Sequence, residues 1–332
     1  MISHASAAKQ DLNTHPLGEL TALDTADGSL SLHSSHFSEA FHSSAGALAE
    51  AQAKFVAPAQ LQRFQTGTSL RVLDVCVGLG YNSAALMDAL RRQSAPQLQW
   101  WGLELDPRPL RLALATQAFT SLWSATVVQR LEALRDRGQW SEQDSTNGRT
   151  SGGHMLWGDA RRQVAQLPQG LELDLILMDA FSPSRCPELW SEEFLGALAQ
   201  RLAPGGRLLT YSRAAAIRGS LQRAGLELRS LLPAPGQRQE WSSGTLAHRP
   251  MAGQPLAAVG PGWRGLSAME TEHLHTRAAI PYRDPDGRAS ADTIVQRRRD
   301  EQQHCAFEST SRWQRRWTLG CHPPGDPTTG SR

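Results

Sequence analysis

Long apolar runs are absent from this sequence of 332 residues. No segment approaches the ~18 consecutive apolar residues that a membrane-spanning helix requires. The first residues, MISHASAAKQ, lack the apolar stretch of a secretory signal. Cysteine is scarce as well, with four widely spaced residues and no CxxC pair. These absences argue against a membrane partner, a disulfide framework and a bound metal, and they predict a protein of the reducing cytoplasm.

Lysine is nearly absent, because two of the 34 basic residues are lysines and the other 32 (34 − 2) are arginines. The 32 acidic residues leave a net charge of only +2. Proteins that coat nucleic acid usually carry a clear basic excess, so any contact with nucleic acid is expected to be local. The planar fork of arginine suits phosphates, but a compositional bias is the favoured explanation of the preference for arginine.

From residue 70 onward, short apolar runs typical of buried strands alternate with helix-like segments. Seven strands are expected, at residues 70–77, 99–105, 154–157, 171–178, 204–211, 226–231 and 244–247. This alternation predicts an α/β fold, doubly wound, with a mostly parallel seven-stranded sheet and helices on both faces. Residues 141–153 are rich in Ser, Gly, Asn and Asp, which predicts a mobile loop.

The regions flanking this core are expected to differ from it. Residues 1–17 are polar and unpatterned, which predicts a disordered N-terminus. Within 18–65, alternation around Asp27-Gly28 predicts a β-hairpin, and 45–63 has a helical pattern. We therefore expect one domain over 18–248, with its Rossmann core at 70–248. A C-terminal extension at 249–332 is expected to be helical near 289–303 and disordered at its end, 322–332.

Acidic residues stand at the ends of four successive strands: Asp74, Glu104, Asp159 and Asp179. A single such acid is usually a helix N-cap, but the carboxyl ends of parallel strands form one ligand-binding edge. The first acid leads into Gly78-Leu-Gly80, where glycines allow a ligand to approach the backbone. Four acids at this edge therefore predict a ligand site.

A dinucleotide site is the competing interpretation, and an NAD-dependent oxidoreductase would follow from it. The three-glycine fingerprint is incomplete, because Tyr81-Asn82-Ser83 follows Gly80. A literal GxGxxG occurs at 260–265, but no convincing strand precedes it. Both observations disfavour this alternative.

The order of these motifs resembles a Rossmann-fold S-adenosylmethionine-dependent methyltransferase. More narrowly, it is similar to the MnmC/MnmD-type family, which completes 5-methylaminomethyl-2-thiouridine at the tRNA wobble position. The matching segments are FHSSAGALAE (41–50), GLGYN (78–82), DAFSPSRCPELW (179–190), PGG (204–206) and PGQR (235–238) before GTLA (244–247). The resemblance covers roughly 18–248. Cys76 departs from it, because a glycine is usual there.

The resemblance implies methyl transfer to the primary amine of 5-aminomethyl-2-thiouridine. Asp179 would accept hydrogen bonds from that amine, either orienting it or also taking its proton. Glu104 would hold the ribose hydroxyls and Asp159 the adenine amino group. The full set of expected cofactor-binding residues is Asp74, Gly78, Gly80, Tyr81, Asn82, Glu104, Asp159, Ala160 and Asp179. Bifunctional members also carry a flavin-dependent oxidase domain, which is not apparent here, so we expect the methylation step alone, without FAD.

The tRNA anticodon arm is the expected partner, and upstream wobble-uridine modification enzymes are further candidates. The residues expected to contact substrate or tRNA are Glu50, Phe181, Pro183, Arg213, Arg218 and Arg238. For the aromatic ring the alternative is a core position, and for each arginine it is an ordinary surface position. Two other functions stay open: a methyltransferase for a small amine or hydroxyl substrate, and a binding module without catalysis. The oligomeric state is left open.

Overall fold

The computed structural model of the chain describes residues 15–64, 68–91, 96–143, 148–233 and 241–318. Most of the predicted disordered N-terminus (1–14), the end of the chain (322–332) and Arg238 lie outside these ranges.

The central sheet has nine strands in the described residues, in the order β12-β10-β11-β9-β8-β4-β5-β7-β6. Their bounds are β4 Ser69–Val75, β5 Gln97–Glu104, β6 Gln139–Gln143, β7 Thr150–Trp157, β8 Leu173–Met178, β9 Leu202–Thr210, β10 Glu227–Leu231, β11 Gly244–His248 and β12 Trp263–Arg264. Strands β9, β8, β4, β5 and β7 pair in parallel, and antiparallel strands flank them on both sides. The predicted α/β class is confirmed. All seven expected strands adjoin one another, and the edge strands β6 and β12 raise the number to nine.

Side chains of the parallel strands alternate between two hydrophobic cores, one on each face of the sheet. In β8, Leu175 and Leu177 lie in one core, and Ile176 and Met178 lie in the other. The helices of the first core are α4 (Tyr81–Arg91), α5 (Arg108–Leu114), α6 (Gln117–Thr120) and α7 (Ala125–Arg137), and those of the second are α8 (Ala160–Gln163), α9 (Glu192–Gln200) and α10 (Ala215–Arg223). Burial on both faces explains why these strands are continuous apolar runs in the sequence.

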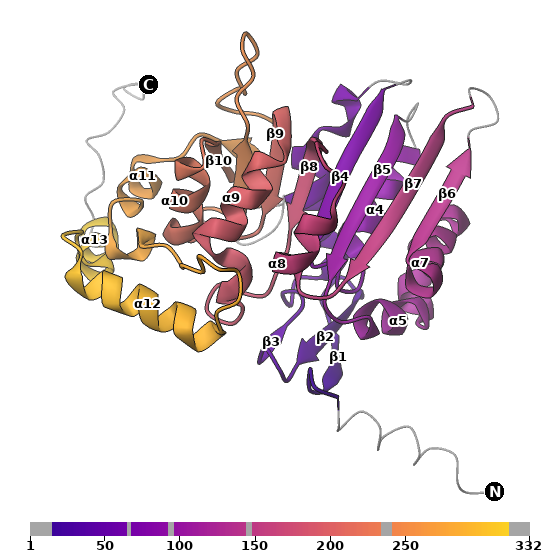
Figure 1. Ribbon diagram of the computed structural model, residues 1–332, viewed down its shortest axis with the longest axis horizontal. Coiled ribbons are helices and arrows are strands. Elements are labelled where there is room, and N and C mark those ends of the chain that lie inside the picture. Colours follow the sequence, from indigo (N-terminus) through magenta and orange to yellow (C-terminus); the bar gives the residue numbers. More distant parts are fainter. Residues whose placement is uncertain (1–14, 65–67, 92–95, 144–147, 234–240, 319–332) are drawn as a thin grey trace, which may run out of the picture.

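A small N-terminal layer lies at the carboxyl ends of the parallel strands (Figure 1). It consists of β1 (Leu20–Asp24), β2 (Leu30–Ser34) and β3 (Glu39–Ala40). The predicted hairpin is confirmed, since β1 and β2 pair antiparallel around Gly28, whose φ is 75°. The predicted helix at 45–63 is a run of short segments: α2 (Ala47–Glu50), a π-helix (Ala51–Val56), α3 (Ala57–Ala59) and a 3₁₀ turn (Leu61–Arg63).

The predicted mobile loop at 141–153 is wrong for the part that the structure describes. β6 and β7 form an antiparallel pair there, with Trp140 opposite Gly153. A Cβ atom on Gly153 would collide with the Trp140 ring. The glycines that suggest a loop therefore make room for a buried tryptophan in a strand pair.

The C-terminal extension continues this architecture. β12 joins the edge of the main sheet, and α11 (Ala268–His273), α12 (Ala291–His304) and α13 (Thr310–Thr318) lie beyond α9 and α10 (Figure 1). The helix predicted at 289–303 is confirmed as α12, whereas α11 and α13 were not expected. None of the helices in the described residues is long and apolar enough to cross a membrane.

Candidate active site

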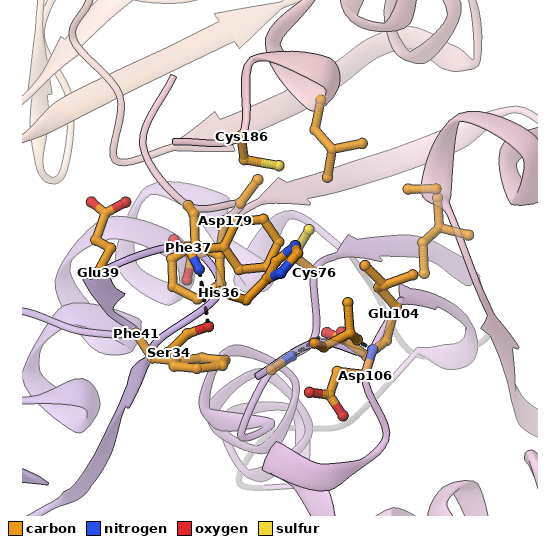
Figure 2. A pocket seen from close by; sticks show the side chains of 18 of the residues that line it. Ser34, His36, Phe37, Glu39, Phe41, Cys76, Glu104, Asp106, Asp179 and Cys186 are labelled. Carbon is orange, nitrogen blue, oxygen red and sulfur yellow. Dashed lines mark hydrogen bonds between the residues drawn. The ribbon is translucent and has the colours of Figure 1, made fainter. Parts of the chain in front are cut away.

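A cavity of about 510 Å³ opens at the carboxyl ends of the parallel strands, beneath the N-terminal layer. Figure 2 shows Phe37, Cys76 and Asp179 grouped in it, with Glu104 and Asp106 farther along. Its walls include seven residues that the sequence assigns to the site: Glu50, Gly78, Glu104, Asp159, Ala160, Asp179 and Phe181. The volume lies in the range of small-molecule sites.

The turn between β4 and α4 brings the backbone to the cavity. Cys76, Gly78 and Gly80 all have positive φ, at 68°, 56° and 93°. A glycine in place of Cys76 would suit this conformation better, because a left-handed backbone costs a side chain energy. Gly80 does not line the cavity; a Cβ atom there would lie 3.1 Å from a methyl group of Leu110. The absence of a side chain at Gly80 therefore allows α5 to pack closely, whereas Gly78 lines the cavity.

Glu104 fixes this turn from the end of β5. Its side chain accepts hydrogen bonds from the backbone N–H groups of Gly78 and Asp106, both at 2.8 Å. The residue is 8% exposed, and burial raises the pKa of Glu104 to about 7, although these two bonds favour the ionised form. Each carboxylate oxygen retains a second lone pair for a ligand.

Asp179 follows β8 and is half-buried in the wall of the cavity. Its Oδ2 accepts a hydrogen bond of 2.7 Å from the side-chain amide of Asn82, in the first turn of α4. Burial raises the pKa of Asp179 to about 7; the Asn82 bond opposes this shift and the charge of Glu50 adds to it. Glu50 itself pairs with Lys54 at 3.2 Å. The carboxylate of Asp179 is thus close to gaining or losing a proton at neutral pH.

The loop after Asp179 is held from three directions. Trp190 Nε1 donates to Phe181 O at 2.7 Å, and Tyr211 Oη donates to Ala180 O at 2.9 Å. From the N-terminal layer, Glu39 Oε2 accepts from Ser182 N at 2.9 Å. These bonds fix the backbone on which Asp179 stands.

Phe181 belongs to an aromatic cluster on this wall. Its ring stacks on Phe37 at 4.4 Å between centroids and meets Phe41 edge-on at 4.9 Å. One ring face is therefore already in contact with the N-terminal layer. Pro183 is half-buried and lies outside the cavity lining.

Asp159 lies at the other end of the cavity, as the N-cap of α8. Its carboxylate accepts from the backbone N–H of Arg161 at 3.0 Å and from the Arg161 guanidinium at 2.7 Å. The guanidinium also donates to Asp284 of the extension at 2.8 Å. The acid expected at the adenine end is thus part of an ion-pair network.

Four residues predicted to bind the cofactor stand behind the cavity wall: Asp74, Gly80, Tyr81 and Asn82. Asp74 is fully buried and accepts a hydrogen bond from Ser83 at 2.5 Å. Burial raises the pKa of Asp74 to about 7. Tyr81 packs edge-on against the rings of His42, Phe119 and Trp123. These contacts support the turn, and direct contact of the four residues with the cofactor stays a prediction.

Of the arginines predicted to touch tRNA, the structure describes Arg213 and Arg218, and neither is exposed. Arg218 is 1% exposed and pairs at 2.8 Å with the fully buried Glu270 carboxylate. It also donates to Thr245 Oγ1 and Gly244 O. The prediction that Arg218 contacts tRNA is therefore wrong, and its side chain instead joins buried parts of the fold. Arg213 is half-buried and donates to Ser242 O at 2.8 Å.

Several lining residues were missed by the sequence analysis: Phe37, Glu39, Lys54, Cys186 and Tyr211. Phe37 and Glu39 come from the N-terminal layer, and no spacing rule connects that layer to the strand ends. Arg185 was also missed as a candidate, although it is exposed in the Asp179–Trp190 motif, next to the lining residue Cys186. Its place inside the motif is the one signal that could have indicated it.

The donor set of the cavity fits S-adenosylmethionine. Seven lining residues carry carboxyl groups: Glu39, Glu50, Glu104, Asp106, Asp159, Asp179 and Glu188. The lining also includes Lys54 and Arg161, which pair with Glu50 and Asp159. Carboxylates suit a ligand with sulfonium and ammonium charges and with hydroxyl and amino donors. Among the described residues, no group of three or more His, Cys, Asp and Glu side chains is arranged to hold a metal ion.

Comparisons with known proteins agree with this chemistry. Residues 139–246 match a family described as S-adenosyl-L-methionine-dependent methyltransferase. The tRNA 5-methylaminomethyl-2-thiouridine biosynthesis bifunctional protein MnmC of Caulobacter vibrioides is 31% identical over 259 residues, which are 70% of this chain and 40% of that protein. The MnmC protein of an Azoarcus species is 30% identical over 253 residues, covering 72% of this chain and 38% of that protein. The crystal structure of MnmC2 from Aquifex aeolicus covers 92% of this chain and 94% of that chain, with a TM-score of 0.67 at 23% identity.

The fold, the acidic cavity and the family match define an S-adenosylmethionine-dependent methyltransferase. More narrowly, the chain carries a methyltransferase domain of the MnmC type. The chain spans about 40% of the length of the bifunctional relatives it matches. The likeness of fold to the solved structure covers 92% of the chain and so includes part of the extension.

Proposed function

We propose that the protein transfers a methyl group from S-adenosylmethionine to the amine of 5-aminomethyl-2-thiouridine at the tRNA wobble position. The observation that carries the proposal is the place of Asp179. It begins the Asp179–Trp190 motif, stands in the wall of the cavity, and is fixed by Asn82. The names of the MnmC relatives supply the substrate class.

Asp179 would act on the acceptor amine. An alkyl amine resembles a lysine, with a pKa of about 10.4 in water, so it is mostly protonated and not nucleophilic at neutral pH. An ionised Asp179 would accept a hydrogen bond from the nitrogen, orient its lone pair, and take the proton that the nitrogen must lose. Glu50 and Lys54 lie nearby and would tune that charge.

The remaining residues would hold the cofactor. When bound, S-adenosylmethionine supplies a methyl group whose bond to sulfur breaks as the amine nitrogen bonds to carbon, the sulfur keeping the electron pair. Gly78 would leave room for the methionine portion, Glu104 would accept bonds from the ribose hydroxyls, and Asp159 would accept from the adenine amino group. Ala160 lies beside Asp159 in the lining.

The tRNA would approach from the side of the Asp179–Trp190 loop. Arg185 is exposed there and could donate to a phosphate, which positions a nucleic acid without reading its sequence. Phe181 and Pro183 would flank the base, since unpaired bases are read by stacking. The aromatic cluster with Phe37 supports Phe181 but leaves less ring surface for a base.

The test is methylation in vitro. Purified protein is incubated with S-adenosylmethionine and tRNA from cells that stop at the aminomethyl stage, and the nucleosides are analysed by mass spectrometry. Fully modified tRNA is the control. We expect one added methyl group on the wobble nucleoside of the first tRNA only; no added methyl would contradict the tRNA assignment.

A small amine or hydroxyl compound is the alternative acceptor, and the small net charge of +2 favours it. Binding of tRNA should weaken steeply with salt because phosphate contacts release counterions. Salt-independent binding together with turnover of a small amine would support the alternative. The proposal concerns the methylation step, and a cytoplasmic location and upstream modification enzymes as partners stay predictions.

A further inference from the structure

The C-terminal extension reaches the cofactor end of the cavity through one buried carboxylate. Asp284 lies between α11 and α12, and its side chain is fully buried. Its Oδ1 accepts from the backbone N–H groups of Arg288 and Ala289, at 3.1 and 3.0 Å. Its Oδ2 accepts from Arg161 Nη1 at 2.8 Å. Three donors from two parts of the chain thus converge on Asp284.

The turn around Asp284 is anchored to the core independently of Arg161. The backbone N–H of Asp284 donates to Glu193 at 2.8 Å, and Arg283 donates to the same carboxylate at 2.7 Å. Next to them, Glu192 N donates to Tyr282 O at 2.9 Å. Residues 282–289 are therefore fixed on the start of α9 and offer the Asp284 carboxylate as a rigid acceptor.

Arg161 links this turn to the cavity. Its Nη1 donates hydrogen bonds to Asp284 Oδ2 and to the carbonyl oxygen of Ala289, at 2.8 and 2.9 Å. Its Nε and Nη2 donate hydrogen bonds to the carboxylate of Asp159, and the shortest of these is 2.7 Å. Because the guanidinium is planar, fixing one edge on the extension fixes the other edge on Asp159. Burial alone would raise the pKa of Asp284, but the hydrogen bonds from Ala289, Arg161 and Arg288 hold it below its usual value, so the acceptor stays charged.

We propose that residues 282–289 complete the cofactor site, with Asp284 as a positioning residue that acts through Arg161 to hold Asp159 toward the adenine amino group. This inference rests on the role proposed above for Asp159. Without the Asp284 carboxylate, Arg161 would keep Ala289 O and Asp159 as acceptors but would lose the one charged group that holds the far edge of its guanidinium. The side chain of Asp159 would then be held less firmly. The extension would then be part of the binding site for the cofactor, and its consequence is selectivity for an amino group on the purine ring.

The experiment is calorimetric binding of two ligands to the full chain. One ligand is S-adenosylhomocysteine, and the other is its analogue with hydrogen in place of the adenine amino group. Wild type should prefer the first ligand. Asp284→Asn should weaken binding of the first about tenfold, the value of one lost charge-assisted hydrogen bond, and should leave the analogue nearly unchanged.

The matched control is Asp286→Asn, because Asp286 is exposed on the same turn and loses the same charge. Thermal unfolding checks that each variant is folded. Arg161→Lys is the second variant, since it keeps the charge but loses the planar fork, and it should lose the same discrimination.

Three results would overturn the inference: equal weakening of both ligands by Asp284→Asn, the same loss in Asp286→Asn, or unchanged discrimination in Asp159→Asn. The assay contains no tRNA, so its outcome is independent of whether the methyl acceptor is a wobble uridine. Failure of the methylation assay with intact discrimination here would instead remove only the tRNA assignment.

Discussion

At one end of the cavity the carboxylate of Asp179 receives a hydrogen bond from the neutral amide of Asn82 and has the acid Glu50 nearby. At the other end the carboxylate of Asp159 is gripped by the Arg161 guanidinium, which is in turn held by Asp284. The first environment raises the pKa of Asp179 to about 7 through burial. In the second environment, the carboxylate of Asp159 lies next to the permanent positive charge of Arg161.

This difference separates two tasks. A group that must exchange or share a proton works best when its pKa lies near the working pH. A group that must only accept a hydrogen bond works best when its charge and direction are constant. We therefore propose that the chemistry takes place at the Asp179 end and that the Asp159 end recognises the cofactor, and the following changes test that division.

The largest effect is expected for Asp179→Asn, which keeps the shape of the side chain and removes its charge. Turnover of tRNA should fall about 10²–10⁴-fold, the usual range for a lost acid–base group. Binding of S-adenosylhomocysteine by calorimetry should change by less than about tenfold, since ~1.4 kcal/mol is at stake for one contact. Activity equal to wild type would remove Asp179 from the mechanism.

The next effect is expected for Asp159→Asn. Affinity for S-adenosylhomocysteine should fall about tenfold, because a bond to a charged acceptor becomes a bond to a neutral one. The maximal rate at saturating cofactor should stay near wild type, which steady-state kinetics would measure. A large fall in kcat with unchanged affinity would reverse the division between the two ends.

The pH dependence of kcat gives a smaller but directional test. With Asp179 needed in its ionised form, kcat should fall on the acidic side of about pH 7, where the carboxyl group binds its proton. Asn82→Ala removes a bond that stabilises the ionised form, so the acidic limb should move upward by about one pH unit. A limb that stays in place in this variant would contradict the role of Asn82 in setting the charge of Asp179.

Arg185→Ala should have the smallest effect and should spare both ends. One lost phosphate contact should weaken tRNA binding a few-fold and reduce the salt slope by about one. The matched control is Arg91→Ala, which removes an exposed arginine at the end of α4 away from the cavity. Equal effects of the two variants in filter-binding titrations would contradict a specific phosphate contact of Arg185.

The sequence is informative about the site where chain topology alone brings residues together. Glu104 ends β5, and Asp159 and Asp179 follow β7 and β8 in the same parallel part of the sheet, so their meeting at one edge follows from the strand order. For Asp74 the sequence is less informative, because a strand-end acid can also point inward, here toward Ser83. The periodicity of the sequence does not indicate in which of these two directions the side chain points.

Long-range contacts were beyond prediction. Arg218 has the sequence setting of a surface arginine, and its burial becomes intelligible only with Glu270, 52 residues away. Phe37 and Glu39 reach the site because the N-terminal layer lies over the strand ends (Figure 1). Gly153 suggested a loop because the sequence does not show that it faces Trp140 on the neighbouring strand. In each case the decisive partner is distant in sequence and follows no local rule.

The central claim concerns the atom that receives the methyl group. The most direct measurement is a single-turnover reaction with isotopically labelled methyl on the cofactor and undermethylated tRNA, followed by fragmentation of the wobble nucleoside in a mass spectrometer. The account predicts the label on the side-chain nitrogen of that nucleoside with wild type, and a rate lowered by Asp179→Asn far more than by Asp159→Asn. Label on a ribose, on a ring atom or on another nucleoside would contradict it.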